Sequence, residues 1–130
     1  MPFVSAADAP NAHLVEVPFD GPIPAQGIDR QPLVGTPSMR HVMLAFAPNF
    51  KTIPHRHPGA GESFLILAGS GWFTIAGERY EALPGRLLWA PTDEVHAIEA
   101  GPEGLRFMAS VGPNEDRPDE EVLVTEESAG

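Results

Sequence analysis

The sequence predicts an all-β fold, a sandwich or barrel of short strands in one domain. From residue 38 onward, short apolar runs are separated by glycine or proline roughly every 8–12 residues, which is typical of such folds. No window of helical length carries an amphipathic helical stripe. At 130 residues the chain can bury a core covering roughly two-thirds of its unfolded surface.

The N-terminal segment differs from the rest because it holds seven of the 15 prolines within 37 residues. Proline removes a backbone donor and confines strands to sheet edges, so we expect an extended arm over residues 1–37 that packs on the barrel. One short edge strand is expected within it, at 14–17. The barrel itself is expected over 38–112, and an acidic tail over 113–130.

Turn residues divide the barrel region into strands. Pro48 and Asn49 close the first strand, and Gly69 and Gly71 separate the third from the fourth. Glycines 77 and 85 mark the next two turns. The expected strands, in chain order, are 40–47, 50–57, 62–68, 72–75, 79–81, 87–90, 95–100 and 104–111, with a last edge strand at 122–124.

Composition excludes several classes of protein. The formal charge of −10, from 18 acidic against 8 basic residues, argues against nucleic acid and anionic membranes as partners. No apolar run approaches the ~20 residues that span a bilayer, and residues 1–10 do not resemble a secretion signal. We therefore expect a cytoplasmic protein. Without cysteine, a metal site must use imidazole and carboxylate ligands.

The strongest functional feature is the pair His55 and His57, followed by Glu62 and later by His96. Residues two apart on a strand point to the same face, so both histidines can converge on one point. His96 comes 34 residues after Glu62, which is far enough for two further strands to bring it alongside. Such a set holds a divalent transition metal. The alternative is a metal-free pair of strand histidines that hydrogen-bond to a buried glutamate.

These residues lie in two motifs that resemble those of the cupin family. The first reads His55-x-His57-x4-Glu62-x6-Gly69, and the second reads Gly85-x5-Pro91-x-Asp93-x2-His96. The resemblance extends from residue 47 to residue 100. Three positions depart from the family pattern: Asn49 and Asp93 replace glycines, and Ala100 replaces a frequent asparagine. Asn and Asp tolerate left-handed backbone, so both turns can form.

The resemblance implies a cupin-type jelly-roll β-barrel of two antiparallel sheets with little or no helix. It also implies one metal ion bound by His55, His57, Glu62 and His96. Iron, manganese, nickel, zinc and copper all suit these ligands, and the sequence does not distinguish them. Compact proteins of this family are commonly dimers, so a homodimer is expected.

Three histidines and a glutamate leave one or two coordination positions open, as in a catalytic or ligand-binding site. We expect an enzyme that acts on a small organic molecule, dioxygenase-like, with the metal supplying the chemistry. The alternatives are a binding or sensor module without turnover, and an isomerase or lyase.

A few further side chains are candidates for the site. His41, Glu94 and Tyr80 are possible acid–base groups, although a surface or core position is the simpler explanation of each. Phe64, Trp72, Trp89 and Phe107 are possible walls of a substrate pocket, with core packing as the other interpretation.

Overall fold

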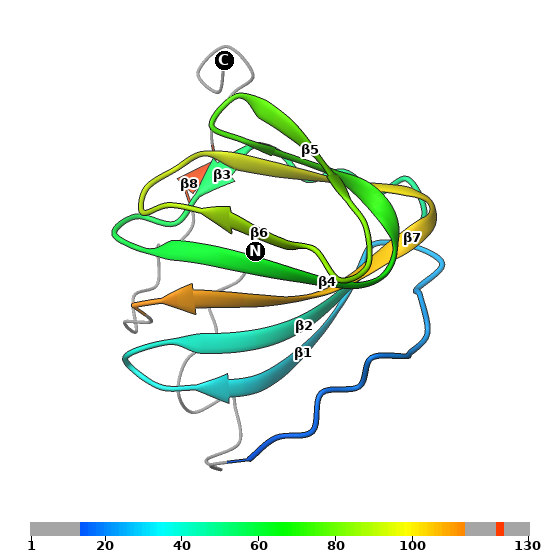
Figure 1. Ribbon diagram of the computed structural model, residues 1–130, viewed down its shortest axis with the longest axis horizontal. Helices are drawn as coiled ribbons and strands as arrows, with labels where there is room; N and C mark the ends of the chain where they lie inside the picture. Colours follow the sequence, from blue (N-terminus) through cyan, green and yellow to red (C-terminus); the bar gives the residue numbers. More distant parts are fainter. Residues whose placement is uncertain (1–13, 114–121, 124–130) are drawn as a thin grey trace.

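The computed structural model describes residues 14–113 and 122–123, and its strands form two antiparallel layers that face each other (Figure 1). The described part contains no helix that is long and apolar enough to cross a membrane. The strands are β1 (Ile28–Gly35), β2 (Arg40–Phe46), β3 (His55–Arg56), β4 (Gly61–Ile75), β5 (Glu78–Ala82), β6 (Leu87–Ala90), β7 (His96–Gly112) and β8 (Val122–Leu123).

The two long strands β4 and β7 pair with each other along most of their length and belong to both layers. In one layer, the first half of β4 lies between β6 and the second half of β7, and β2 and β1 follow on the other side of β7. In the other layer, the second half of β4 pairs with β5 and with the start of β7, which leads to β3 and β8. Figure 1 shows this arrangement.

The change of layer occurs where the β4–β7 register shifts on both sides of Gly69. Gly69 has a φ of 83°, and a Cβ atom added there would lie 2.1 Å from the carbonyl oxygen of Gly104. Only glycine allows the two backbones to approach this closely. The glycines therefore let two long strands bend without losing their pairing.

The core fills the space between the layers. Along β4, Glu62, Phe64 and Ile66 are buried while Leu65 is partly exposed, as the two-residue period of a strand requires. Four buried phenylalanine rings contact one another in a chain through the core: Phe46, Phe107, Phe64 and Phe73.

The observed strands confirm the all-β prediction and correct several of its boundaries. The expected strands at 62–68 and 72–75 are one strand, β4, and those at 95–100 and 104–111 are one strand, β7. The expected strand at 50–57 is reduced to β3 and one isolated bridge at Lys51. The last edge strand is described only as β8, because residue 124 and the acidic residues 114–121 lie outside the described part.

The N-terminal segment was also partly mispredicted. Residues 14–17 form no strand, whereas β1 lies inside the segment expected to be an arm. Pro32 is tolerated because, among the described strands, β1 pairs with β2 alone, and its register shifts between Pro32 and Val34. The segment before β1 lies on the sheet, where the Arg106 guanidinium donates a hydrogen bond of 3.1 Å to the carbonyl oxygen of Pro18.

Candidate metal centre

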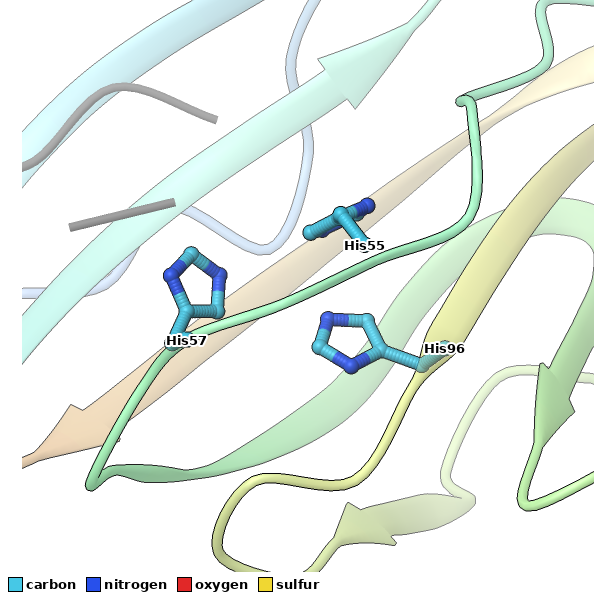
Figure 2. Close-up of side chains that lie close together, drawn as sticks. All are labelled: His55, His57 and His96. Atoms are coloured by element: carbon cyan, nitrogen blue, oxygen red, sulfur yellow. The ribbon is translucent and has the colours of Figure 1, made fainter. Parts of the chain in front are cut away.

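The structure brings His55, His57 and His96 together, as the sequence predicted. One ligand atom from each ring lies within 4.8 Å of the others, and all three side chains are buried. Figure 2 shows the three rings, with His55 and His57 on the same segment and His96 at the start of β7. The pairing of β3 with β7 places His55 directly opposite His96, at a ring-centroid distance of 4.4 Å.

Backbone carbonyl groups orient two of the three rings. The Nδ1 atom of His55 donates to the carbonyl oxygen of Ile53 at 2.9 Å, and that of His96 donates to the carbonyl oxygen of Glu94 at 3.2 Å. A carbonyl oxygen only accepts hydrogen bonds, so Nδ1 carries the proton and the neutral ring has an unprotonated Nε2. Metal-binding histidines are commonly held in this way.

Glu62 lies against the same cluster and is fully buried. Its Oε1 atom is 3.1 Å from the Nε2 of His96 and 3.3 Å from the Nε2 of His57. Burial alone would raise the pKa of Glu62, but the adjacent His57 and His96 rings outweigh burial and hold the pKa below its usual range. A positive charge beside the carboxylate, on a ring or on a bound cation, therefore favours its ionised form.

A positive charge at the centre would stabilise this arrangement. When His96 is neutral, its bare Nε2 faces an ionised carboxylate oxygen, and two electron-rich atoms at 3.1 Å repel each other. Within the described residues, both Glu62 oxygens and the Nε2 atoms of His57 and His96 are buried without a hydrogen-bond partner. A cation bound by all of them would satisfy these atoms, so the donor set fits a divalent transition metal.

Protonation of His55 does not compete with a metal near neutral pH. Burial, and secondarily the neighbouring His96 ring, lowers the pKa of His55 to about 3. The ring is therefore neutral and able to act as a ligand.

A cavity of about 290 Å³ opens beside these residues. His55, Glu62 and His96 line it, which makes the centre accessible to a small molecule. The remaining lining residues, most of them apolar, are Ile28, Phe46, Phe50, Lys51, Thr52, Ile53, Phe64 and Ile98.

The loops that carry the ligands are joined by Asp93. Its Oδ1 accepts a hydrogen bond of 2.7 Å from the backbone N–H of Gly59 and lies 3.4 Å from the guanidinium of Arg56. Its own backbone N–H donates to the carbonyl oxygen of Ala60 at 3.3 Å. Asp93 adopts a φ of 64°, the left-handed conformation predicted for this turn.

None of the three acid–base candidates has its side chain in the cavity. His41 lies in β2 and its Nδ1 is 2.7 Å from the hydroxyl of Ser110, and burial lowers its pKa. Tyr80 is exposed and donates to the carboxylate of Glu78. Glu94 contributes its backbone carbonyl to His96 instead of a side chain to the cavity.

Of the four pocket candidates, Phe64 lines the cavity, and its ring centroid lies 5.4 Å from that of His96. Phe107 is buried in the core. Trp72 lies under the guanidinium of Arg79, and Trp89 is 60% exposed on β6. The sequence reasoning missed Ile53 and Ile98, which line the cavity. Ile98 is two residues from His96 on β7 and shares its strand face, so parity could have identified it, whereas Ile53 precedes β3 and belongs to no strand.

Comparison with known proteins agrees with this geometry. The sequence profile of the AraC-like ligand-binding domain family matches residues 44–122, which include all four predicted ligands. Among curated proteins, dimethylsulfoniopropionate lyase DddW of Ruegeria pomeroyi is 47% identical over 62 residues, covering 48% of this chain and 40% of that protein. The chain spans less than two-thirds of the length of the curated relatives that it matches.

Solved structures share the fold. A cupin-2 domain from Rhodospirillum rubrum aligns with a TM-score of 0.68 and 21% identity, covering 88% of this chain and 76% of that one. The dimethylsulfoniopropionate lyase DddQ of Ruegeria pomeroyi aligns with a TM-score of 0.65 and 19% identity, covering 80% of this chain and 54% of that one. At these identities the likeness shows the fold alone, and that fold is the predicted cupin barrel.

Proposed function

We propose that this chain, which belongs to the family of AraC-like ligand-binding domains within the cupin superfamily, binds one divalent transition metal. We propose further that it acts on a small organic molecule at that metal. His55, His57, Glu62 and His96 would hold the metal. The observation that carries this proposal is the buried, ionised Glu62, which faces histidine nitrogens without hydrogen-bond partners. A metal cation would satisfy the carboxylate and the nitrogens together, whereas the metal-free alternative needs a protonated histidine ring that donates to Glu62.

The cavity walls favour a reaction in which the metal supplies the chemistry. When bound, such a metal supplies Lewis-acid or oxygen-activating chemistry. Apart from the ligands, Lys51 is the one ionisable residue that lines the described cavity, and its ammonium group lies 3.6 Å from Glu99 with a 68% exposed side chain. Proton shuttling by protein groups therefore has little support, and we favour a dioxygenase-like enzyme over an isomerase.

A lyase is the second candidate function. The 47% identity to a protein named as a dimethylsulfoniopropionate lyase supports it, although the match covers 40% of that protein. An elimination needs a group that accepts a proton from carbon. In the cavity described above, that group would have to be Lys51 or one of the proposed metal ligands, such as Glu62.

A ligand-binding module without turnover is the third candidate, and the description of the family supports it. Cytoplasmic location and homodimer formation remain predictions.

Metal content tests the proposal directly. We expect about one metal ion per chain by elemental analysis, loss of the metal with a chelator, and recovery on adding it back. His96→Ala should lower metal affinity at least tenfold, because it removes a ligand from a small set. His41→Ala is the matched control, since His41 lies outside the centre, and should retain the metal. Full metal content in His96→Ala would contradict the ligand assignment.

A substrate screen with the metal-loaded protein then separates the candidate functions. Oxygen consumption with phenols, thiols or sugar acids would support an oxygenase. Cleavage of dimethylsulfoniopropionate without oxygen consumption would support a lyase. If none of these compounds is converted while small molecules raise the melting temperature, the binding module is the correct function.

A further inference from the structure

The walls of the cavity define the class of molecule that fits beside the metal ligands. Phe46, Phe50 and Phe64 provide aromatic surface, and Ile53 and Ile98 add aliphatic surface. Phe46 and Phe50 pack edge to face at 5.3 Å, so this part of the wall is held in place. At about 290 Å³, the cavity is at the small end of those that bind metabolites.

Few polar groups on the wall can serve a bound molecule. The Thr52 hydroxyl already accepts a hydrogen bond of 2.9 Å from the backbone N–H of Ile98. The backbone of Lys51 pairs with Glu99, and its ammonium group also turns toward that residue. A polyhydroxylated molecule would therefore lose hydrogen bonds to water on entering and find few replacements.

We infer that the substrate or ligand has a single metal-binding head group and an apolar, preferably aromatic, body, and that sugars and sugar acids are excluded. This inference rests on the proposed metal centre. The head group would meet His55, Glu62 and His96, while the body would lie against the phenylalanine rings and Ile53.

Three hydroxamates with the same head group test the inference in the metal-loaded protein by calorimetry. Benzohydroxamate should bind at least tenfold more tightly than acetohydroxamate, because its ring leaves water for an apolar wall. Gluconohydroxamate should bind no more tightly than acetohydroxamate. Binding of gluconohydroxamate equal to or tighter than that of benzohydroxamate would overturn the inference.

Two exposed aliphatic residues provide matched variants. Ile53 is 60% exposed and lines the cavity, whereas Leu87 is 66% exposed on β6 and does not line it. Ile53→Asn should reduce the preference for benzohydroxamate at least threefold, and Leu87→Asn should leave it unchanged. Equal preferences in both variants would refute the role of this wall. Metal content is measured first, so failure of metal binding is recognised separately from failure of this inference.

A different observation, the set of contacts made by Asp93, carries a second inference. Arg56 lies between two predicted ligands, Gly59 follows His57 by two residues, and Asp93 precedes His96 by three. The Asp93 carboxylate therefore links the loop after β3 to the loop before β7. The Arg56 contact is exposed and adds little, so the 2.7 Å hydrogen bond from Gly59 is the main link.

The geometry points to Asp93 as a positioning residue that fixes the separation of the two ligand-bearing loops. This inference also rests on the proposed metal centre. A turn-forming role alone would not need the side chain, because glycine adopts a φ of 64° with less strain than aspartate.

The substitution Asp93→Gly separates these roles. It relieves backbone strain but removes the link, so metal affinity should fall at least tenfold in competition with a chelator, even where the fold is unchanged by circular dichroism. Asp93→Asn keeps an oxygen acceptor and should restore affinity to within about threefold of the native protein.

Asn49→Gly is the matched control. Asn49 also has a positive φ, of 62°, in the turn of the first motif, and its backbone N–H bonds to Gly101 outside the ligand loops. It should leave metal affinity unchanged. If Asp93→Gly binds metal as tightly as Asn49→Gly, Asp93 serves only the turn and the inference is wrong.

Discussion

At the scale of single residues, the candidate site combines a buried carboxylate with three buried imidazole rings, a set that a cation would stabilise. Glu62 is ionised and buried, and His55 is kept neutral by burial. Their protonation states are those that a metal ion needs in its ligands. The carbonyl groups of Ile53 and Glu94 add to this by directing Nε2 of each ring inward. Backbone carbonyl groups therefore orient two of the three rings toward the proposed metal position.

The protonation of His55 gives a prediction for the metal-stripped protein. In the unfolded chain His55 binds a proton below pH 6.5, whereas in the folded chain it does so only near pH 3. Between these values the unfolded state binds more protons, so stability falls as the pH is lowered. The depressed pKa of Glu62 acts in the same direction below pH 4.5.

We therefore expect the melting temperature of the metal-stripped protein to fall as the pH decreases from 6.5 toward 3. His55→Gln removes the titrating ring and should show a shallower decrease. Parallel melting curves for the two proteins across this range would contradict the buried, neutral state of His55.

At the scale of secondary structure elements, β4 and β7 determine where the ligands lie. His96 begins β7 and Glu62 lies at the start of β4, so the β4–β7 pairing fixes their relative position. That pairing passes through the glycine bend at Gly69. The geometry of the site thus depends on a backbone contact remote from it in sequence.

Substitution of Gly69 should lower the free energy of unfolding more than substitution of a glycine that has a similar φ elsewhere in the chain. Gly69→Ala would place a methyl group against the Gly104 carbonyl and should reduce the free energy of unfolding by about 3 kcal/mol or more. Gly77→Ala, at a φ of 79° with no atom within 4 Å, should cost only about 1–2 kcal/mol. Denaturant unfolding measures both, and equal costs would show that the close contact is unimportant.

At the scale of the whole molecule, the barrel has a hydrophobic core that does not depend on the metal centre. The buried cluster runs from Val42 in β2 to Ala109 in β7 and fills the space between the layers. A metal should therefore add stability to a folded protein and should not be required for folding.

Chelation should lower the melting temperature by roughly 5–15 °C if the metal was present at about a hundredfold above its dissociation constant. Far-ultraviolet circular dichroism should retain its β-type spectrum and one cooperative transition. Unfolding on chelation at room temperature would show that the centre is a structural requirement.

Much of the fold followed from local patterns, and the failures have physical causes. Strands such as β2 and β6 were predicted because apolar runs and the turn residues that bound them are local features of the sequence. Strand β1 was missed because it lies in the proline-rich N-terminal segment, and its pairing with β2 along a sheet edge offsets the loss of a donor at Pro32. The two long strands β4 and β7 were predicted as four because their internal glycines are typical of turns. In the structure the register shifts at these glycines, and the two strands stay paired on both sides of the shift.

The sequence by itself determined the fold class and the three histidines that converge, because strand parity and motif spacing are local properties of the chain. Only the tertiary structure decided which side chains surround them. Trp72 and Trp89 turned out to lie away from the cavity, whereas Phe46, Phe50 and Ile98 line it. Which face of a strand meets the cavity depends on its layer and register, and these are set by pairing between strands distant in sequence.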